Sequence, residues 1–289
     1  MTTLALKDRF STRARAFWAA TRLGWAIESN WTDPFVFLTY QVVRPLFGAL
    51  ILVVMYHVVR GANFDPAMFA QIYVANAFFI IVLQSLIVIG SVVFEDRERY
   101  EMIRYVYLAP MGLGPYIVAR GASHVTATSA SVVLTLLMGV LGFGLQLHLH
   151  WLGVPYFVAT LLLGIVATLA LGLMLSGMTM LLAHHGMLMP EGVSGVLYLC
   201  CGVVFSIDML PGPLATIGRL MPWTYWLEGF RRVFLGSTFN PSLASLTDGA
   251  ILLRLTGLTA VTCVVGWMTL MGAQGIAVAR GKLDEKTDH

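Results

Sequence analysis

Long runs of apolar residues make up most of the chain, and short polar stretches interrupt them. A helix that spans a membrane needs about 20 mainly apolar residues. Six runs approach or exceed this length, namely residues 34–59, 66–94, 125–147, 154–183, 192–207 and 255–279. The pattern predicts an all-α, polytopic membrane protein whose six transmembrane helices occupy residues 34–279. An even number of spans places both termini, including the tail 280–289, on one side.

Residues 1–30 show the periodicity of a helix that lies in the membrane interface. On a helical wheel the apolar side chains gather on one side, whereas Arg15 and Arg22 lie opposite. Such a helix rests at the membrane surface and does not cross it. A simple basic anchor without a further role is the alternative. The apolar side consists of Leu6, Phe10, Ala14, Phe17, Trp18, Thr21 and Trp25.

The segment between the second and third runs, residues 95–115, concentrates charge. Seven of the ten residues from Glu95 to Arg104 are charged, and aromatic and apolar residues follow them. Because no glycine or proline precedes Pro110, we expect one short amphipathic helix along the cytoplasmic surface. Opposite charges three and four residues apart support it. A solvated face without a partner is the alternative.

A second irregular segment follows the fifth run. Pro211, Gly212 and Pro213 end the fifth helix, and apolar residues resume helical spacing over 214–230. Pro222 stands where a further helix would begin. We expect a re-entrant helical hairpin that enters or rests on the outer leaflet, with its aromatic residues in the interfacial belt.

Small residues recur at every fourth position in the third and fourth runs. In lipid, such ridges allow helix backbones to approach closely. Because only six residues join the two runs, we expect these helices to pack against each other as a hairpin. The ridges consist of Ala127, Ser131, Thr135 and Gly139, and of Gly164, Thr168, Gly172 and Ser176.

Composition and charge agree with a membrane protein and indicate its orientation. Of the 289 residues, 58% are apolar and 11% are charged, which excludes a water-soluble globule. The net charge of +3 is too small and too dispersed for binding nucleic acid. Thirteen of the 18 Lys and Arg residues lie on the side of the termini, so we expect both termini in the cytoplasm.

The sequence contains neither metal-ligand spacing nor a nucleotide-binding motif. Cys200, Cys201 and Cys263 lie inside apolar runs, without the spacing of a metal site. The phosphate-binding pattern G-x-x-x-x-G-K-[S/T] is absent. We therefore expect a chain that is not an enzyme and that binds no metal.

Together these segments resemble the permease subunit of type-2 ABC transporters, over almost the whole chain as a single domain. The charged segment resembles the coupling helix of that family, which ends here in Leu108-Ala109-Pro110. Residues 205–231 resemble its external helices and end in an acidic-Gly-x-Arg pattern. One departure is that Glu101-Met102-Ile103-Arg104 stands where the family usually reads Gly-Thr-Leu-Glu.

The resemblance implies ATP-driven export of a hydrophobic or amphipathic molecule, drug-like or lipid, through a dimer of permease subunits. The second permease would be another copy or a paralogue, in the bacterial cytoplasmic (inner) membrane. Two copies of a soluble ATP-binding cassette ATPase would hold ATP and Mg, so this chain would bind no cofactor. A lipid-linked glycan is an alternative cargo, and an ATP-independent carrier or channel is an alternative function, although no internal repeat supports it.

Three groups of residues are candidates for these roles. The contact with the ATPase subunit would involve Glu98, Arg99, Glu101 and Arg104. An outer gate would involve Trp223, Glu228, Arg231 and Arg232, although local pairing that holds the outer hairpin together is the alternative. The pathway would be lined by Arg44, Asn76 and Gln84, although snorkelling of the arginine and hydrogen bonds to neighbouring helices are the alternatives.

Overall fold

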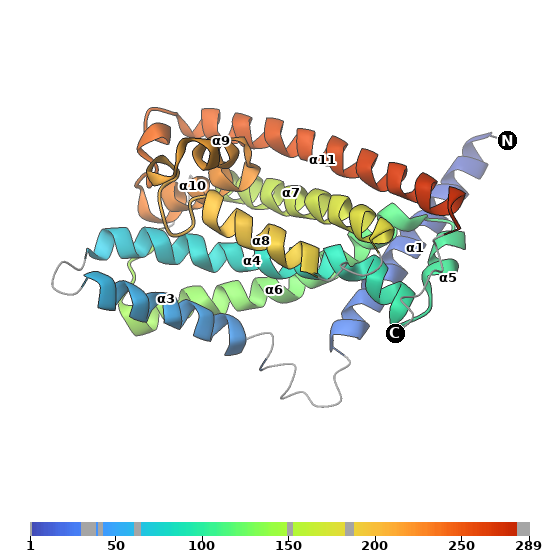
Figure 1. The fold of residues 1–289 in the computed structure, drawn as a ribbon, viewed down its shortest axis with the longest axis horizontal. Helices are drawn as coiled ribbons and strands as arrows, with labels where there is room; N and C mark the ends of the chain where they lie inside the picture. The colour runs from blue at the N-terminus through green and yellow to red at the C-terminus, as the bar shows by residue number, and fades with distance from the viewer. Residues whose placement is uncertain are drawn as a thin grey trace.

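A computed structural model describes residues 2–29, 39, 43–60, 65–148, 153–182 and 188–281. This part of the chain consists of helices and their connections and contains no strand. The long helices lie side by side, and α1 (Thr2–Ser29) crosses one end of the bundle obliquely (Figure 1). The chain is therefore all-helical, as the sequence predicts.

Six apolar helices form the bundle, and each overlaps one of the six apolar runs. Four of them are long and apolar enough to cross a membrane, whereas α3 and α8 are shorter, with 17 and 13 residues. The chain is thus a multi-pass membrane protein. The helices are α3 (Arg44–Arg60), α4 (Pro66–Glu98), α6 (Leu113–Phe143), α7 (Val154–Leu181), α8 (Leu188–Cys200) and α11 (Asp248–Ala279).

Several of the runs differ from the helices that the structure contains. The third run begins at residue 125, whereas α6 begins twelve residues earlier, at Leu113. The fifth run reaches residue 207, but α8 ends at Cys200 because a turn follows in which Gly202 has a φ of +75°, a conformation that glycine adopts readily. The first run begins at residue 34, and residues 34–38 and 40–42 lie outside the described residues.

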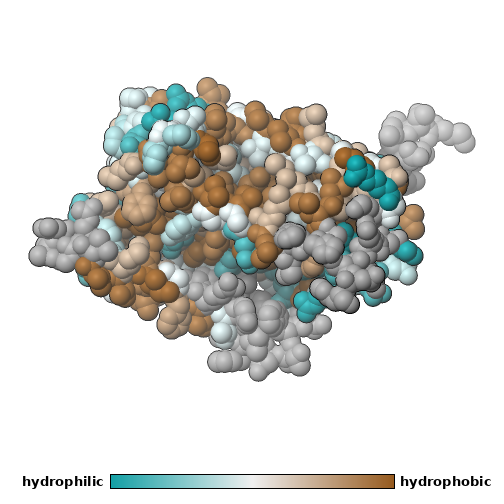
Figure 2. Space-filling model, viewed as in Figure 1, coloured by the Kyte–Doolittle hydropathy of each residue, from teal (hydrophilic) through white to brown (hydrophobic). Residues whose placement is uncertain are grey.

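Helix α4 is the centre of the bundle. Asp65 caps its first turn by accepting hydrogen bonds from the backbone N–H groups of Ala67 at 2.9 Å and Met68 at 3.4 Å. Helices α3, α6, α7, α8 and α10 (Pro222–Leu235) all pack against α4, and most of its apolar residues are buried. The outer flanks of the other helices are largely hydrophobic, with hydrophilic residues near the two ends (Figure 2), as expected of a surface that meets lipid.

The ridges of small residues contact other helices than the sequence predicts. In α6, Gly139 lies against the Tyr73 ring of α4, whose hydroxyl donates to the carbonyl of Thr135 at 2.7 Å. In α7, Gly172 lies against Ile89 of α4, and Ser176 donates to the Ile89 carbonyl at 2.5 Å. The α6 ridge and the end of the α7 ridge thus face α4, whereas the start of the α7 ridge contacts the two tryptophans of α10. The expected pairing of α6 with α7 through these ridges is wrong. A ridge permits close approach without specifying the partner.

The two ends of the bundle carry different short helices. Helix α5 (Ile103–Leu108) lies at the end where α1 crosses and α11 ends. The opposite end carries η4 (Ile207–Met209), α9 (Gly212–Leu220), α10 (Pro222–Leu235) and η5 (Pro241–Leu243). The expected breaks at Pro211 and Pro222 are therefore present.

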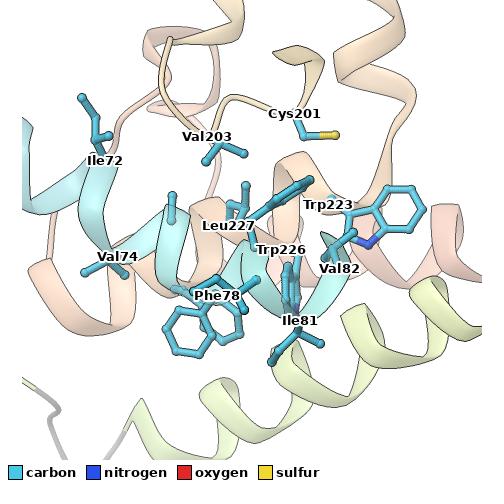
Figure 3. Close-up of a cluster of buried hydrophobic side chains, with 14 of the residues drawn as sticks. Ile72, Val74, Phe78, Ile81, Val82, Cys201, Val203, Trp223, Trp226 and Leu227 are labelled. Atoms are coloured by element: carbon cyan, nitrogen blue, oxygen red, sulfur yellow. The ribbon is translucent and has the colours of Figure 1, made fainter. Parts of the chain in front are cut away.

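An aromatic cluster attaches α10 to the bundle. Phe78 of α4 stacks on Phe230 with ring centroids 3.8 Å apart, and Trp226 contacts both rings edge-on. Figure 3 shows Phe78 and Trp226 close together, with Ile81 beside the indole. Burial of large aromatic side chains contributes strongly to stability, so α10 is a packed part of the core.

Candidate functional site

Helix α5 is a short, partly exposed element at the end of the bundle. Helix α4 ends at Glu98, before α5 begins. In the connection between them, the backbone N–H of Met102 donates to the carbonyl of Asp96 at 2.8 Å. Ile103 and Val106 point into the protein and are buried, whereas Tyr105 is 77% and Leu108 is 82% exposed. An apolar surface of this kind at a polar end of a protein is typical of a docking site.

The four residues predicted for ATPase contact lie at this end, but not on one helix. Glu98 is the last residue of α4 and forms an ion pair with Arg97 at 3.0 Å. Arg99 follows the helix, with its guanidinium 5.7 Å from the centroid of the Tyr100 ring. Only Arg104 belongs to α5, where it is exposed. The expected single amphipathic helix is wrong, because the charged residues extend α4 by one turn.

The backbone conformation of Glu101 accounts for the break between α4 and α5. Its φ is +50°, in the left-handed region that side chains other than glycine seldom adopt. The resembling family usually has glycine at this position, as noted above. Glutamate in place of glycine thus keeps the same backbone conformation, and we infer that the backbone of this chain is strained at Glu101.

A buried charge cluster that sequence reasoning missed lies beside α5. Arg120 of α6 donates from Nη1 to Asp96 Oδ1 at 2.7 Å, and its Nη2 lies 3.6 Å from Glu95 Oε2. In the sequence, Arg120 counts only as one of the thirteen positive charges on the side of the termini. Arg120 is the eighth residue of α6, a helix long enough to cross a membrane. A charged residue inside such a helix needs a partner, and this signal could have indicated the cluster.

Helix α1 packs on α6 through small residues. Ala20 and Gly24 are buried, whereas Phe17, Trp18 and Trp25 are exposed. The exposed aromatic residues belong to the apolar side that the helical wheel predicts, and they suit contact with the lipid interface. The side chains of residues 2–11, including Leu6 and Phe10, lie outside the described residues.

At the opposite end, Arg231 connects several parts of the chain. Its guanidinium donates to the carbonyls of Gly202 at 2.6 Å, Val203 at 3.1 Å and Gln71 at 3.1 Å, and it lies over the Phe239 ring at 4.1 Å. The side chain is fully buried. Carbonyl dipoles stabilise a buried cation, so this residue holds α4, α10 and the turn after α8 together.

Glu228 completes this network. Its carboxylate accepts hydrogen bonds from the backbone N–H of Phe239 at 3.0 Å and from Nδ2 of Asn240 at 2.8 Å, and it lies 3.8 Å from Arg231 Nη1. Burial raises the pKa of Glu228 above its usual 4.5 and lowers the pKa of Arg231 to about 10. Arg231 therefore stays charged at neutral pH.

Trp223 and Arg232, the other gate candidates, are also engaged. Trp223 donates from its indole nitrogen to Thr168 Oγ1 at 3.0 Å. Arg232 donates to the carbonyls of Leu246 at 2.7 Å and Leu243 at 2.8 Å and pairs with Asp248 at 2.9 Å. All four candidates lie on α10, where their contacts attach this helix to α4, α7 and the neighbouring connections. Their role as a gate stays a prediction.

The candidates for the pathway bridge helices where they are described. Asn76 of α4 accepts a hydrogen bond from the Tyr198 hydroxyl of α8 at 3.0 Å. Gln84 of α4 accepts one from Thr128 of α6 at 3.4 Å. Arg44 begins α3, but its side chain lies outside the described residues. Hydrogen bonds between neighbouring helices are the alternative to lining the pathway that the sequence left open for these polar residues.

The described residues contain no group of three His, Cys, Asp or Glu side chains that could hold a metal ion. The charged groups at both ends form structural ion pairs and caps. What the arrangement offers chemically is a rigid bundle with an exposed apolar helix at one end. This suits mechanical coupling to another protein.

Comparison with known protein families matches the chain to the model of the ABC-2 type transporter over residues 15–235. No curated protein matches the chain. The matched segment extends from α1 through α10 and includes both α5 and the outer hairpin. The match covers well over half of the 289 residues and agrees with the multi-pass helical fold. The chain is therefore a permease that belongs to the ABC-2 type transporter family.

Proposed function

We propose that the chain is the membrane subunit of an ATP-driven exporter, and that a separate ATP-binding cassette ATPase binds at α5. The observation that carries this proposal is the exposure of Tyr105 and Leu108 on a helix held at the end of the bundle. A solvent-facing tyrosine and leucine on one short helix form the kind of apolar anchor that a groove on a partner binds.

The chemistry of α5 refines the predicted contact. Arg104, Tyr105 and Leu108 form its centre, since they are exposed on the helix itself. Glu98, Arg99 and Glu101 flank it and would set orientation through charge. ATP and Mg would bind in the partner, and two ATPase copies would serve two permeases.

The remaining features of the proposal follow the family. Two permease subunits would form a pathway for a hydrophobic or amphipathic cargo, drug-like or lipid, with both termini in the cytoplasm of a bacterial cell. The excess of Lys and Arg on the α5 side supports this orientation. The apolar outer faces of α3 and α11 offer surface for a second subunit or for lipid.

The test measures ATP turnover with and without the partner. Purified alone, the chain should not hydrolyse ATP, and turnover should appear when it is co-purified with an ATP-binding cassette ATPase encoded beside it. Leu108→Glu should abolish co-purification and turnover, because burying an unpaired carboxylate in an apolar contact is costly.

Met209→Glu is the matched control, because Met209 is an exposed apolar residue at the opposite end. This variant should assemble like the native chain. Turnover by the chain alone would contradict the two-component scheme. Normal assembly of the Leu108→Glu variant would show that α5 is not the docking site.

A further inference from the structure

An ion pair inside the protein joins the end of α4 to the start of α6. The side chain of Asp96 is 0% exposed and that of Arg120 is 3% exposed, and the bond between them measures 2.7 Å. Arg120 Nη1 also donates to the Tyr116 hydroxyl at 3.3 Å. A buried pair of this geometry is strongly directional, and loss of Asp96 would leave Arg120 with only the longer, partly exposed contact to Glu95 at 3.6 Å. The pair therefore specifies how the two helix ends are placed.

This pair closes a ring of the chain that contains α5. Asp96 and Arg120 are 24 positions apart, and α5 lies between them. Within the ring, the backbone carbonyl of Asp96 also accepts the N–H of Met102, which precedes α5. Ile103 and Val106 are buried in a cluster that includes residues of both α4 and α6. A ring closed at its base resists splaying of the two helices, so a force on α5 reaches both.

The interface helix contacts the same turn of α6. Gly24 lies so close that a Cβ there would be 3.3 Å from the Cα of Arg120. The carboxylate of Glu28 lies 2.9 Å from Nδ1 of His124. Helix α1 is thus attached one turn beyond the ion pair and has to follow α6 when α6 moves.

We propose that the pair of Asp96 and Arg120 is a clamp that makes α5 and the inner ends of α4 and α6 one rigid lever. When the ATPase subunit displaces α5, the clamp carries α6, and α1 with it, in the same movement. Without the clamp, α5 moves while α6 stays in place. Asp96 and Arg120 are positioning residues, and this inference rests on the proposed function.

The experiment measures distances between spin labels in the complex with the ATPase subunit, in lipid nanodiscs. Exposed positions on three helices carry the labels in a Cys263→Ser background, as Tyr107→Cys on α5, Thr126→Cys on α6 and Val278→Cys on α11. Distances from α11 to α5 and from α11 to α6 are compared without nucleotide and with ATP and vanadate. In the native sequence, both distances should change.

Three variants separate the clamp from general damage to the fold. Asp96→Asn should keep the change at α5 and lose the change at α6. Asp96→Leu combined with Arg120→Met removes both charges, so that no unpaired arginine is buried in the folded protein. This double variant should also keep the change at α5 and lose the change at α6. The exchange of Asp96→Arg with Arg120→Asp restores an ion pair and should restore the movement of α6. Side chains that only fill space would give no reason to expect this recovery. Asp208→Asn, which removes an ion pair at the opposite end, should leave both changes intact.

The outcomes distinguish the clamp from the proposed function. If α6 moves normally in both Asp96 variants, the clamp is refuted while ATP-driven coupling stands. If neither distance changes in the native complex, ATP does not drive α5, and both proposals are overturned. Loss of movement that the exchanged pair fails to restore also contradicts the clamp.

Discussion

Arginine residues at the end of the bundle that carries α9 and α10 differ greatly in burial, although each has an acidic neighbour. Arg231 is fully buried and binds three carbonyl groups, whereas Arg219 is 51% exposed and pairs with Asp208 at 3.1 Å. Water already solvates an exposed pair, so its loss costs about 0–1 kcal/mol. Removal of a buried partner leaves the remaining groups without compensation and costs about 3–5 kcal/mol.

Replacement of Arg231 should therefore destabilise the protein much more than replacement of Arg219. Arg231→Ala leaves the carbonyls of Gly202 and Val203 unpaired and Glu228 without its cation, and we expect a loss of about 3–5 kcal/mol. Arg219→Ala should cost less than about 1 kcal/mol. Thermal unfolding in detergent can be followed with a thiol-reactive dye, because Cys200 and Cys201 are buried in the folded protein. Equal unfolding temperatures for the two variants would contradict this account of Arg231.

At the scale of helices, close backbone contact joins α11 to α7. A Cβ at Gly266 of α11 would collide with the backbone carbonyl of Ala170 of α7. Gly177 of α7 lies similarly close to the backbone of Leu270. Backbone atoms cannot rotate aside as a side chain can, so these glycines permit the approach of the two helices.

Two glycine-to-alanine substitutions in α11 should therefore have opposite effects. Gly266→Ala forces the helices apart, and we expect a loss of about 1–3 kcal/mol, the usual cost of overpacking. Gly257→Ala meets no atom within 4 Å and should stabilise the helix by about 0.5–1 kcal/mol through its higher helix propensity. The same unfolding assay measures both, and a stabilised Gly266→Ala variant would show that α7 and α11 are not in close contact.

At the scale of the whole molecule, the two ends should face different compartments. The excess of positive charge on the side of α5 predicts that this end faces the cytoplasm and that η4 faces outward. Opposed orientation of the ends is a condition for export, since the ATPase subunit can reach only one of them.

Membrane-impermeant maleimide should label the two ends differently in intact cells. In a Cys263→Ser background, Met209→Cys at the exposed turn of η4 should react, whereas Arg104→Cys of α5 should react only after the membrane is permeabilised. The buried Cys200 and Cys201 serve as an internal blank. Labelling of Arg104→Cys in intact cells would place the proposed docking helix outside and refute the coupling scheme.

Local sequence patterns were enough to identify the apolar helices and the irregular segments between them. Length and composition of an apolar run are local properties, and so are the helix breaks at Pro211 and Pro222. The exposed aromatic side of α1 is also local, because it depends only on helical periodicity. Membership of the ABC-2 type transporter family was evident at the same level, through the two irregular segments.

The contacts between helices and the pairing of charges became known from the three-dimensional fold alone. The bond from Arg120 joins residues 24 positions apart, and that from Arg231 to Gln71 joins residues 160 positions apart. The contact of the two small-residue ridges with α4 and α10 is of the same kind. No local pattern contains this information, because partners are selected by the packing of the whole bundle. The positive φ of Glu101, between α4 and α5, was likewise not evident from the residue type, because residues other than glycine seldom adopt this conformation.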